Sequence, residues 1–368
     1  MSSTLNPIVD SIYDLCIELY NKLQQSDDIV YSAHSLFIAF SLLYLGSGGE
    51  TKRQLEKVFG FERIESFESE LRSLLQACAV KPESPSQYEM TNSIWTDKRF
   101  NLNPAFVGKV SEMMCRLESV DFQNSPDEAV HTINEFISSA THNKINDFLK
   151  RESISESTVA LIINSLYFKS RWQEVFDPLF EGILFEGVGR VKAMSKGLFI
   201  RSSVTDDYTS VVIPYADKNY TMTIVMPTSD ETSLSATFIK DVMINTMKKE
   251  PTNIKLTMPQ FNMRSQLSLK EVLMRMGVVD TFTSNADFQQ IGDKDIYVSD
   301  VRQEAIINVN EAGTEAAAVT GIFIACLSLI YYDGEITINK PFYFVLSDER
   351  LTPLFFGKVT HPISIDQE

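Results

Sequence analysis

The sequence has few of the side chains from which catalytic and metal sites are most often built. Its 368 residues include four histidines and four cysteines, and none of them forms an HExxH, paired HxH or nucleophile-elbow motif. Gly187 and Gly189 lack the third glycine and the lysine of a phosphate-binding loop. Carboxylates are plentiful but scattered, so no acid/base pair stands out. We therefore expect no catalytic residue, no metal and no cofactor, and we expect the chain not to be an enzyme.

The few histidines and cysteines are given structural roles instead. His34 stands between an expected strand and an expected helix, His131 and His142 lie in a polar helical stretch, and His361 stands beside Pro362. Surface or capping positions are therefore expected for all four. The cysteines are far apart in mostly apolar surroundings, which is typical of buried free thiols. They are Cys16, Cys78, Cys115 and Cys326.

Clustered positive charge is also missing. The formal net charge is -16, and no basic run is longer than a pair. Because nucleic acids, heparin and anionic membranes are bound through clustered Lys and Arg, none of them is expected as a partner. The N-terminus lacks the basic start and uninterrupted apolar core of a secretory signal. Together with the few cysteines, this predicts a cytoplasmic protein, or one that is secreted without a signal peptide.

No linker rich in Pro, Gly or Ser divides the chain, so residues 1–368 are expected to form one domain. Helical periodicity is expected in the first part, with helices from Pro104 to about Leu149 and a break near Asp121. Residues 159–172 then form a long central strand with almost no charge in its first half. Short alternating strands follow, with a helix over residues 267–276. This order of elements indicates an α+β fold with large sheets.

One segment near the C-terminus is unusual. Residues 316–332 carry no charge, which raises a membrane span as an alternative, but the run is short and has acidic flanks. Its first half consists of small residues and its second half of bulky ones. In an extended chain one side of it would be free of charge, although a helix beginning at the alanine run is equally open. That side would comprise Thr314, Ala316, Ala318, Thr320, Ile322 and Ile324.

This segment and four other blocks together resemble the serpin family over nearly the whole chain. The segment begins with the sequence NEAGTEAAA, which is similar to the hinge of serpins. The remaining blocks are SVDFQNSPDEAVHTINEFISSATHNKI from residue 119, NSLYFKSRWQEVFDP from residue 164, ADF before DIYVSDV, and PFYFV with LFFGKVTHP at the end. Five blocks in the family's order make the resemblance specific.

The resemblance implies a fold of three β-sheets and eight or nine helices, with a reactive-centre loop at about residues 311–335. It implies that a protease cleaves this loop, that the loop then inserts as a new strand of the central sheet, and that the acylated protease is trapped. The scissile bond is expected between Leu327 and Ser328, within a register uncertainty of residues 325–330. The hinge residues implied are Glu311, Gly313, Thr314, Glu315, Ala316, Ala317 and Ala318.

The family pattern also marks a sheet-opening region, which here comprises Ser32, Ser35, Asn164, Trp172 and Gln303. Gln303 replaces a frequent His, and Gln260 stands where a Lys often pairs with the hinge Glu311. The hydrogen bonds beneath the central sheet are therefore expected to differ from the family's usual network.

The expected partner is a serine protease with an apolar primary pocket, of the chymotrypsin, cathepsin G or elastase type, because a Leu precedes the expected bond. A papain-like cysteine protease is an alternative target, from another class of protease. A non-inhibitory serpin-fold binding protein or chaperone is the alternative function.

Overall fold

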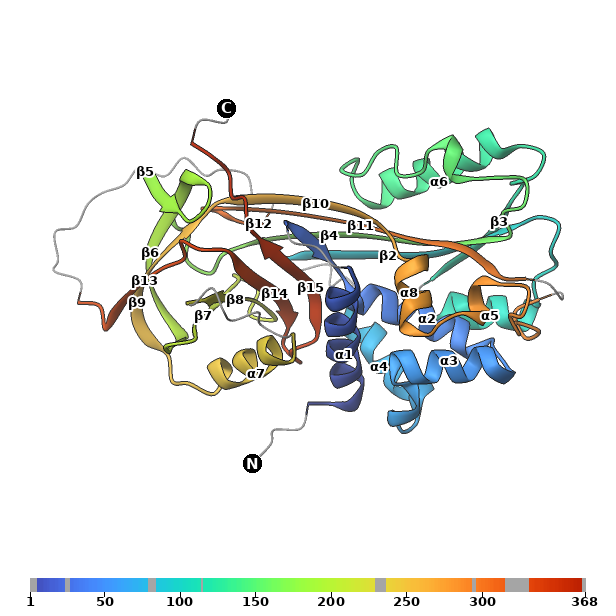
Figure 1. Cartoon of the computed structure of the whole chain (residues 1–368), viewed down its shortest axis with the longest axis horizontal. Coiled ribbons are helices and arrows are strands. Elements are labelled where there is room, and N and C mark those ends of the chain that lie inside the picture. Colours follow the sequence, from blue (N-terminus) through green and yellow to red (C-terminus); the bar gives the residue numbers. More distant parts are fainter. Residues whose placement is uncertain are drawn as a thin grey trace.

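The computed structural model describes residues 5–23, 27–78, 84–113, 115–228, 236–292, 296–314 and 331–365. Within these ranges the chain forms eight α-helices and two hydrogen-bonded sheets, so the α+β prediction is confirmed. In Figure 1 one sheet runs along the long axis of the molecule, and the second sheet occupies one end of it.

The long sheet has six strands in the order β10-β11-β12-β4-β2-β3. Helices cover both of its faces (Figure 1), so its central strand β4 is buried along most of its length and reads as a continuous apolar run. The strands are β2 (Gln87–Asp97), β3 (Arg116–Val120), β4 (Ala160–Arg171), β10 (Phe261–Ser268), β11 (Val298–Asn310) and β12 (Gly313–Thr314).

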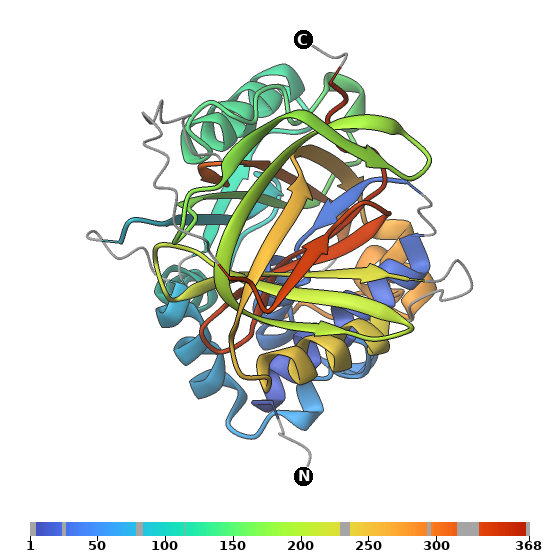
Figure 2. The same cartoon turned by 90° about the vertical axis from the view of Figure 1, so that its left-hand side faces the viewer.

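The second sheet has nine strands in the order β1-β15-β14-β8-β7-β6-β9-β13, with β5 also paired to β6. Residues 193–200 of β6 pair with β9 and residues 201–204 pair with β7, so one long strand joins two parts of this sheet (Figure 2). Dividing it at β6 gives the three sheets that the resemblance implies. Its strands are β1 (Ile29–Tyr31), β5 (Asp177–Phe185), β6 (Gly189–Val204), β7 (Tyr208–Pro214), β8 (Tyr220–Pro227), β9 (Thr252–Pro259), β13 (Gly334–Thr337), β14 (Phe342–Asp348) and β15 (Pro353–Val359).

Helix α6 lies on one face of the long sheet and the remaining helices near that sheet lie on the other (Figure 1). Helix α2 is apolar on all sides and almost wholly buried, which is typical of a core helix. The helices are α1 (Pro7–Leu23), α2 (Ala33–Leu45), α3 (Gly49–Phe59), α4 (Phe67–Cys78), α5 (Pro104–Glu112), α6 (Pro126–Ala140), α7 (Ala236–Met247) and α8 (Lys270–Met276), and short 3-10 turns span Phe61–Arg63, Arg151–Ser153 and Asp280–Phe282.

Several predicted elements are wrong in type or extent. The break expected near Asp121 is present and includes strand β3, but the helix after it ends at Ala140 and does not reach Leu149. Three residues after it have left-handed backbones that no helix tolerates: His142, Asn143 and Asp147. The helix expected over residues 267–276 begins only at Lys270, because strand β10 extends to Ser268. Strands β5, β6 and β10 and helix α7 were not predicted.

Candidate functional site at the seam of the long sheet

Strands β4 and β11 meet along a line that we call the seam. They pair in parallel, from Ala160 opposite Val298 to Leu166 opposite Ala305. Beyond this pair the two strands no longer bond to each other, and strand β12 lies between them. Thr314 of β12 pairs with Ser170 of β4 and with Val309 of β11. The seam is therefore closed over most of its length and open at one end.

Strand β12 reaches the open end through a tight turn after β11. The Oδ1 atom of Asn310 accepts hydrogen bonds from the backbone N–H of Ala312 and of Gly313, at 2.9 and 3.2 Å. Gly313 has φ of 150°, and a Cβ atom placed on it would lie 2.1 Å from the backbone oxygen of Ser170. Only glycine fits this position, because a side chain would clash with the backbone of β4.

Thr314 is fully buried at the end of the described hinge. Its hydroxyl lies 2.6 Å from the phenol oxygen of Tyr215, and the Tyr215 ring stacks on Trp172 at a centroid distance of 4.5 Å. Burial raises the pKa of Tyr215, and the hydrogen bond with Thr314 opposes that rise. The phenol thus remains neutral, and the hinge ends in an enclosed polar contact.

Trp172 and Gln260 hold the turn that precedes β12. The indole Nε1 of Trp172 donates to the backbone oxygen of Asn310 at 2.9 Å, and its backbone N–H donates to Ala312 at 3.1 Å. The side chain of Gln260 donates to Glu311 Oε2 at 3.1 Å. A neutral amide thus contacts Glu311 at the position where the family often has a lysine.

Ser32, Ser35 and Gln303 come together on the α2 side of the seam. The side-chain amide of Gln303 bonds the backbone of Ser32 twice, accepting from its N–H at 2.8 Å and donating to its oxygen at 2.9 Å. Ser32 caps α2, since its hydroxyl accepts from the N–H of Ser35 at 3.1 Å. Gln303 therefore fixes the start of α2 against strand β11.

Asn164 is joined to the same region through Asn92, which sequence reasoning missed. Asn92 Oδ1 accepts from the hydroxyl of Ser35 at 2.7 Å and from Asn164 Nδ2 at 2.5 Å. Asn92 of β2 lies directly opposite Asn164 of β4. The amide of Asn92 within strand β2 was the available signal in the sequence. Which residue it contacts depends on the register between β2 and β4, which the sequence does not give. All five predicted residues are buried. Ser32, Ser35, Asn164 and Gln303 lie together at the middle of the seam, whereas Trp172 lies at its open end.

The remaining predicted residues of the loop lie outside the described residues. This applies to the hinge residues Glu315, Ala316, Ala317 and Ala318 and to the expected reactive bond between Leu327 and Ser328. Those assignments stay predictions.

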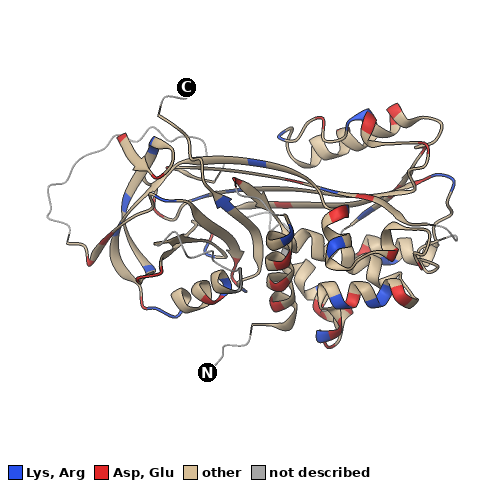
Figure 3. Ribbon diagram, in the orientation of Figure 1, with Lys and Arg blue, Asp and Glu red and all other residues tan. Residues whose placement is uncertain are grey.

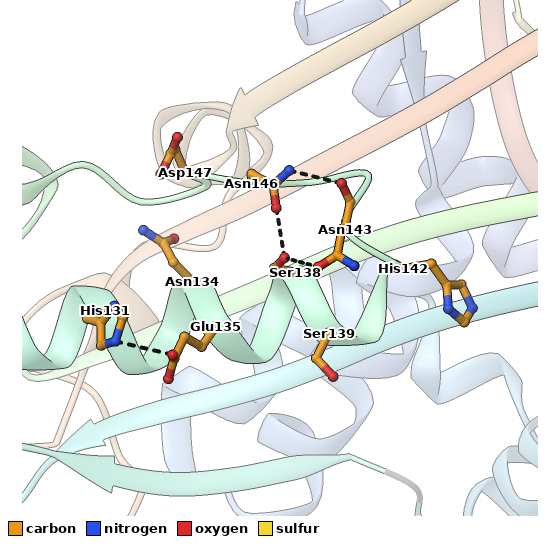
Figure 4. A pocket seen from close by; sticks show the side chains of 9 residues that line it. All are labelled: His131, Asn134, Glu135, Ser138, Ser139, His142, Asn143, Asn146 and Asp147. Atoms are coloured by element: carbon orange, nitrogen blue, oxygen red, sulfur yellow. Dashed lines mark hydrogen bonds and ion pairs between the residues drawn. The ribbon is translucent and has the colours of Figure 1, made fainter.

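Helix α6 covers the opposite face of the seam. Its buried Ile133 and Ile137 pack with Ile163 of β4, and Ile306 of β11 packs against the same cluster. After α6 the chain turns back over the helix, where the Ser138 hydroxyl contacts Asn143 and Asn146 (Figure 4). An open polar pocket lies between the helix and this return, which leads toward β4. Separating β4 from β11 would therefore disturb the contacts of α6.

His34 lies at the junction of strand β1 and helix α2 as expected, but it is not on the surface, whereas His131, His142 and His361 are exposed as predicted. His34 is fully buried in the first turn of α2, with Nδ1 3.0 Å from the hydroxyl of Tyr88. Burial lowers the pKa of His34 to about 3, so the ring is neutral at physiological pH.

The two thiols that the structure describes agree with the prediction. Cys16 and Cys115 are free and buried, and burial raises the pKa of each thiol to about 12. Such thiols are protonated and unreactive at physiological pH. The side chain of Cys78 and the whole of Cys326 lie outside the described residues.

Within the ranges described, no three His, Cys, Asp or Glu side chains come together as a metal site would require. None of the helices in those ranges combines the length and apolar character needed to cross a membrane. Charged residues of both signs are spread over the helices (Figure 3). Asp10, Asp14 and Glu18 recur every four residues in α1 and therefore share one side of it.

Comparison with known proteins identifies this arrangement. The model of the Serpin (serine protease inhibitor) family matches residues 10–362. The chain belongs to the serpin family. The leukocyte elastase inhibitor of Bos taurus is 30% identical over 357 residues, which cover 91% of this chain and 93% of that protein. Serpins as a family inhibit proteases, and several relatives of this serpin are named as inhibitors.

Solved structures of serpins have the same fold. Uncleaved ovalbumin matches with a TM-score of 0.87 at 23% identity, covering 96% of this chain and all of the other. Human thyroxine-binding globulin in complex with its hormone matches with a TM-score of 0.84 at 20% identity, covering 98% of this chain and all of the other. The predicted serpin fold is therefore confirmed, and members with this fold include a ligand-binding protein.

Proposed function

We propose that this serpin is a suicide-substrate inhibitor of serine proteases that have an apolar primary pocket. The observation that carries the proposal is the position of Gly313 and Thr314, which already pair with both β4 and β11 at the open end of the seam. The chain continues from Thr314 into residues with small side chains. A cleaved loop would thus extend a strand that has already begun.

The register of these two residues supports insertion along the whole seam. Counting on from Thr314, the pairing with β4 brings residue 320 opposite Asn164, and the pairing with β11 brings the same residue opposite Gln303. Asn164 and Gln303 are themselves partners across the closed seam. The two edges therefore accept one inserted strand without a shift in register, which would otherwise turn every side chain to the wrong face.

The residues that would be inserted fit the two faces of the sheet. Ala316, Ala318 and Thr320 would share the buried side with Thr314, and none of them is charged. Glu315 would lie on the other face, opposite the exposed Lys169 of β4. Opposite charges facing each other across strands stabilise a sheet by roughly 0.2 to 1 kcal/mol.

The proposed target class follows from the residue before the expected bond. Leu327 suits the apolar primary pocket of chymotrypsin-like, cathepsin G-like and elastase-like proteases, and no Arg, Lys or Asp lies within residues 325–330. The relative from Bos taurus is named for leukocyte elastase, which belongs to this range. A papain-like cysteine protease is the alternative target.

Incubation with chymotrypsin, cathepsin G and leukocyte elastase tests the proposal. We expect a complex that survives SDS and a released peptide whose mass places the cut after Leu327. Leu327→Arg is the matched variant, since it should move inhibition to trypsin while the hinge stays unchanged. Cleavage that leaves every protease active, with no change in stability after loop cleavage, would instead favour a non-inhibitory binding protein.

We also propose that the protein folds in a reducing compartment and is either cytoplasmic or secreted from there. The free, buried thiols of Cys16 and Cys115 support this. Fractionation of producing cells, with the culture medium probed in parallel, distinguishes the two locations.

A further inference from the structure

The return after α6, residues 141–149, directs a histidine at the long sheet. Helix α6 ends at Ala140, and the backbone is left-handed at His142 and Asn143, with φ of 51° and 60°. The N–H of Asn143 donates to the backbone oxygen of Ser138 at 2.8 Å, which folds the turn back against the helix. In Figure 4 the ring of His142 points away from this turn. The turn thus presents the ring to the strands that α6 covers.

His142 contacts two neighbouring strands on one side of the seam. Its Nε2 lies 2.8 Å from Glu89 Oε1 of β2, and its ring packs edge-on against Tyr167 of β4 at a centroid distance of 5.6 Å. Glu89 and Tyr167 are themselves opposite each other in the sheet. Because an ionised carboxylate only accepts hydrogen bonds, Nε2 carries the proton of this contact. Both contacts lie on the β4 side of the seam, so His142 fastens the return of α6 to that side.

A second contact fastens the return to the other side of the seam. Gln266 of β10, the neighbour of β11, donates from Nε2 to the backbone oxygen of Phe148 at 2.7 Å. The return thus bridges the seam with a side-chain contact on each side. The bond from Gln266 joins two neutral groups, whereas histidine changes its charge between pH 5 and 8. The two contacts therefore differ in their response to pH.

We propose that His142 and Glu89 form a pH-sensitive clamp, which holds the return of α6 on the β4 side of the seam more firmly as the pH falls. The clamp goes beyond the proposed inhibitory function and does not depend on it. Protonation adds a full positive charge to a ring that already donates to a carboxylate, so the hydrogen bond becomes an ion pair. The side chains of His142 and Glu89 are 53% and 24% exposed, so solvent limits the gain to about two- to fivefold in the docking equilibrium.

Other groups around the ring carry charges of both signs. They are Lys144 and Asp147 of the return, His131 and Glu135 of α6, and Lys169, which follows Tyr167 on the same face of β4. His131 lies 3.2 Å from Glu135, four positions along the same helix. Protonation of His131 would stabilise α6 itself and not its contact with the sheet. His131 therefore provides a matched comparison for His142.

Amide hydrogen exchange of residues 141–149 in the full-length protein tests the clamp. Protection factors at about pH 7.5 and pH 5.5 are compared, since they correct for the intrinsic effect of pH on exchange. Protection in the wild type should rise about two- to fivefold at the lower pH. His142→Gln and Glu89→Gln should each lose this rise, because glutamine cannot form the ion pair, whereas His131→Gln should keep it. Gln266→Ala should lower protection by the same factor at both pH values.

A wild type without this rise, or an equal rise in His142→Gln, would overturn the clamp. A rise that survives in Glu89→Gln or vanishes in His131→Gln would do the same, because the charge would then act through another pair. Exchange is measured without a protease, so failure of the clamp leaves the proposed inhibitory function untouched.

Discussion

The open end of the seam and its closed middle differ in how well their polar groups are satisfied. At the open end the side chains of Asn310, Glu311, Thr314 and Trp172 all have hydrogen-bond partners. In the middle, three buried side-chain atoms have none among the described residues: Asn164 Oδ1, Ser165 Oγ and Glu304 Oε2.

The difference has an energetic meaning. Each buried polar atom without a partner costs roughly 1 to 3 kcal/mol, and Ser165 and Glu304 are direct neighbours across the seam. Burial raises the pKa of Glu304, and Arg264 opposes that rise through a contact of 2.6 Å. The hinge thus occupies the well-bonded end, while the unsatisfied groups lie ahead of it, where a further inserted strand would pass.

Thr314→Arg should disturb the well-bonded open end of the seam most. Arginine would place an unpaired charge in the enclosed contact with Tyr215, which destabilises the seated hinge by about 3 to 5 kcal/mol. The variant should be cleaved as a substrate without trapping the protease. The number of inhibitor molecules consumed per protease molecule inactivated should therefore rise. Thr314→Ser retains the hydroxyl and should still inhibit. Inhibition by the arginine variant would show that the register at the open end is wrong.

Gly313→Val should have the next largest effect. The added side chain would meet the backbone of Ser170 in a backbone conformation that disfavours it, at a cost of about 1 to 3 kcal/mol. Strand β12 should leave the seam, which amide hydrogen exchange at residues 309–314 would detect as faster exchange. Gly108→Val is the control, because no described atom beyond its chain neighbours and the backbone of its own helix lies within 4 Å of a Cβ there. Unchanged exchange in Gly313→Val would contradict the close fit.

His34, in the first turn of α2 beside the middle of the seam, should make the stability of the protein depend on pH. Burial lowers its pKa to about 3 in the folded protein, from an ordinary value of 6.5. The unfolded chain therefore binds the proton more readily between these values, and stability present above pH 6.5 is lost as the pH falls toward 3. His34→Gln should reduce the slope of unfolding free energy against pH by up to about 1.4 kcal/mol per unit. Urea unfolding between pH 7 and 4 measures this, and parallel curves would refute it.

Ser35→Ala should have the smallest effect and acts on the middle of the seam. It removes the hydrogen bond from the Ser35 hydroxyl to Asn92 Oδ1 and leaves the one from Asn164 Nδ2, at a cost of about 1 kcal/mol. Urea unfolding should show the loss, while hydrogen exchange at the hinge should not change. Faster exchange at residues 309–314 in this variant would mean that the middle and the open end are not separate regions.

The described residues Gly313, Thr314 and Gln303 could be singled out from the sequence because they follow a family pattern in short, contiguous blocks, and their roles in hinge and sheet opening stay predictions. Tyr215 and Asn92 could not be predicted, although each contacts a predicted residue directly. Tyr215 is 99 positions from Thr314 and Asn92 is 72 from Asn164, so nothing in their local sequence marks the contact. Strands β5, β6 and β10 were missed for a related reason, since strand formation depends on distant partners.

The sequence by itself determined that the hinge is small and uncharged on one side, and that the family fold would form. Only the tertiary structure decided that β4 and β11 are paired as far as Leu166 and Ala305, and that Thr314 is already seated beyond them. It also decided that Asn164 Oδ1 is buried with no hydrogen-bond partner in the part of the chain that the structure describes. These features depend on the register between strands about 140 residues apart, and hydrogen bonds across that separation are set by the packing of the whole sheet.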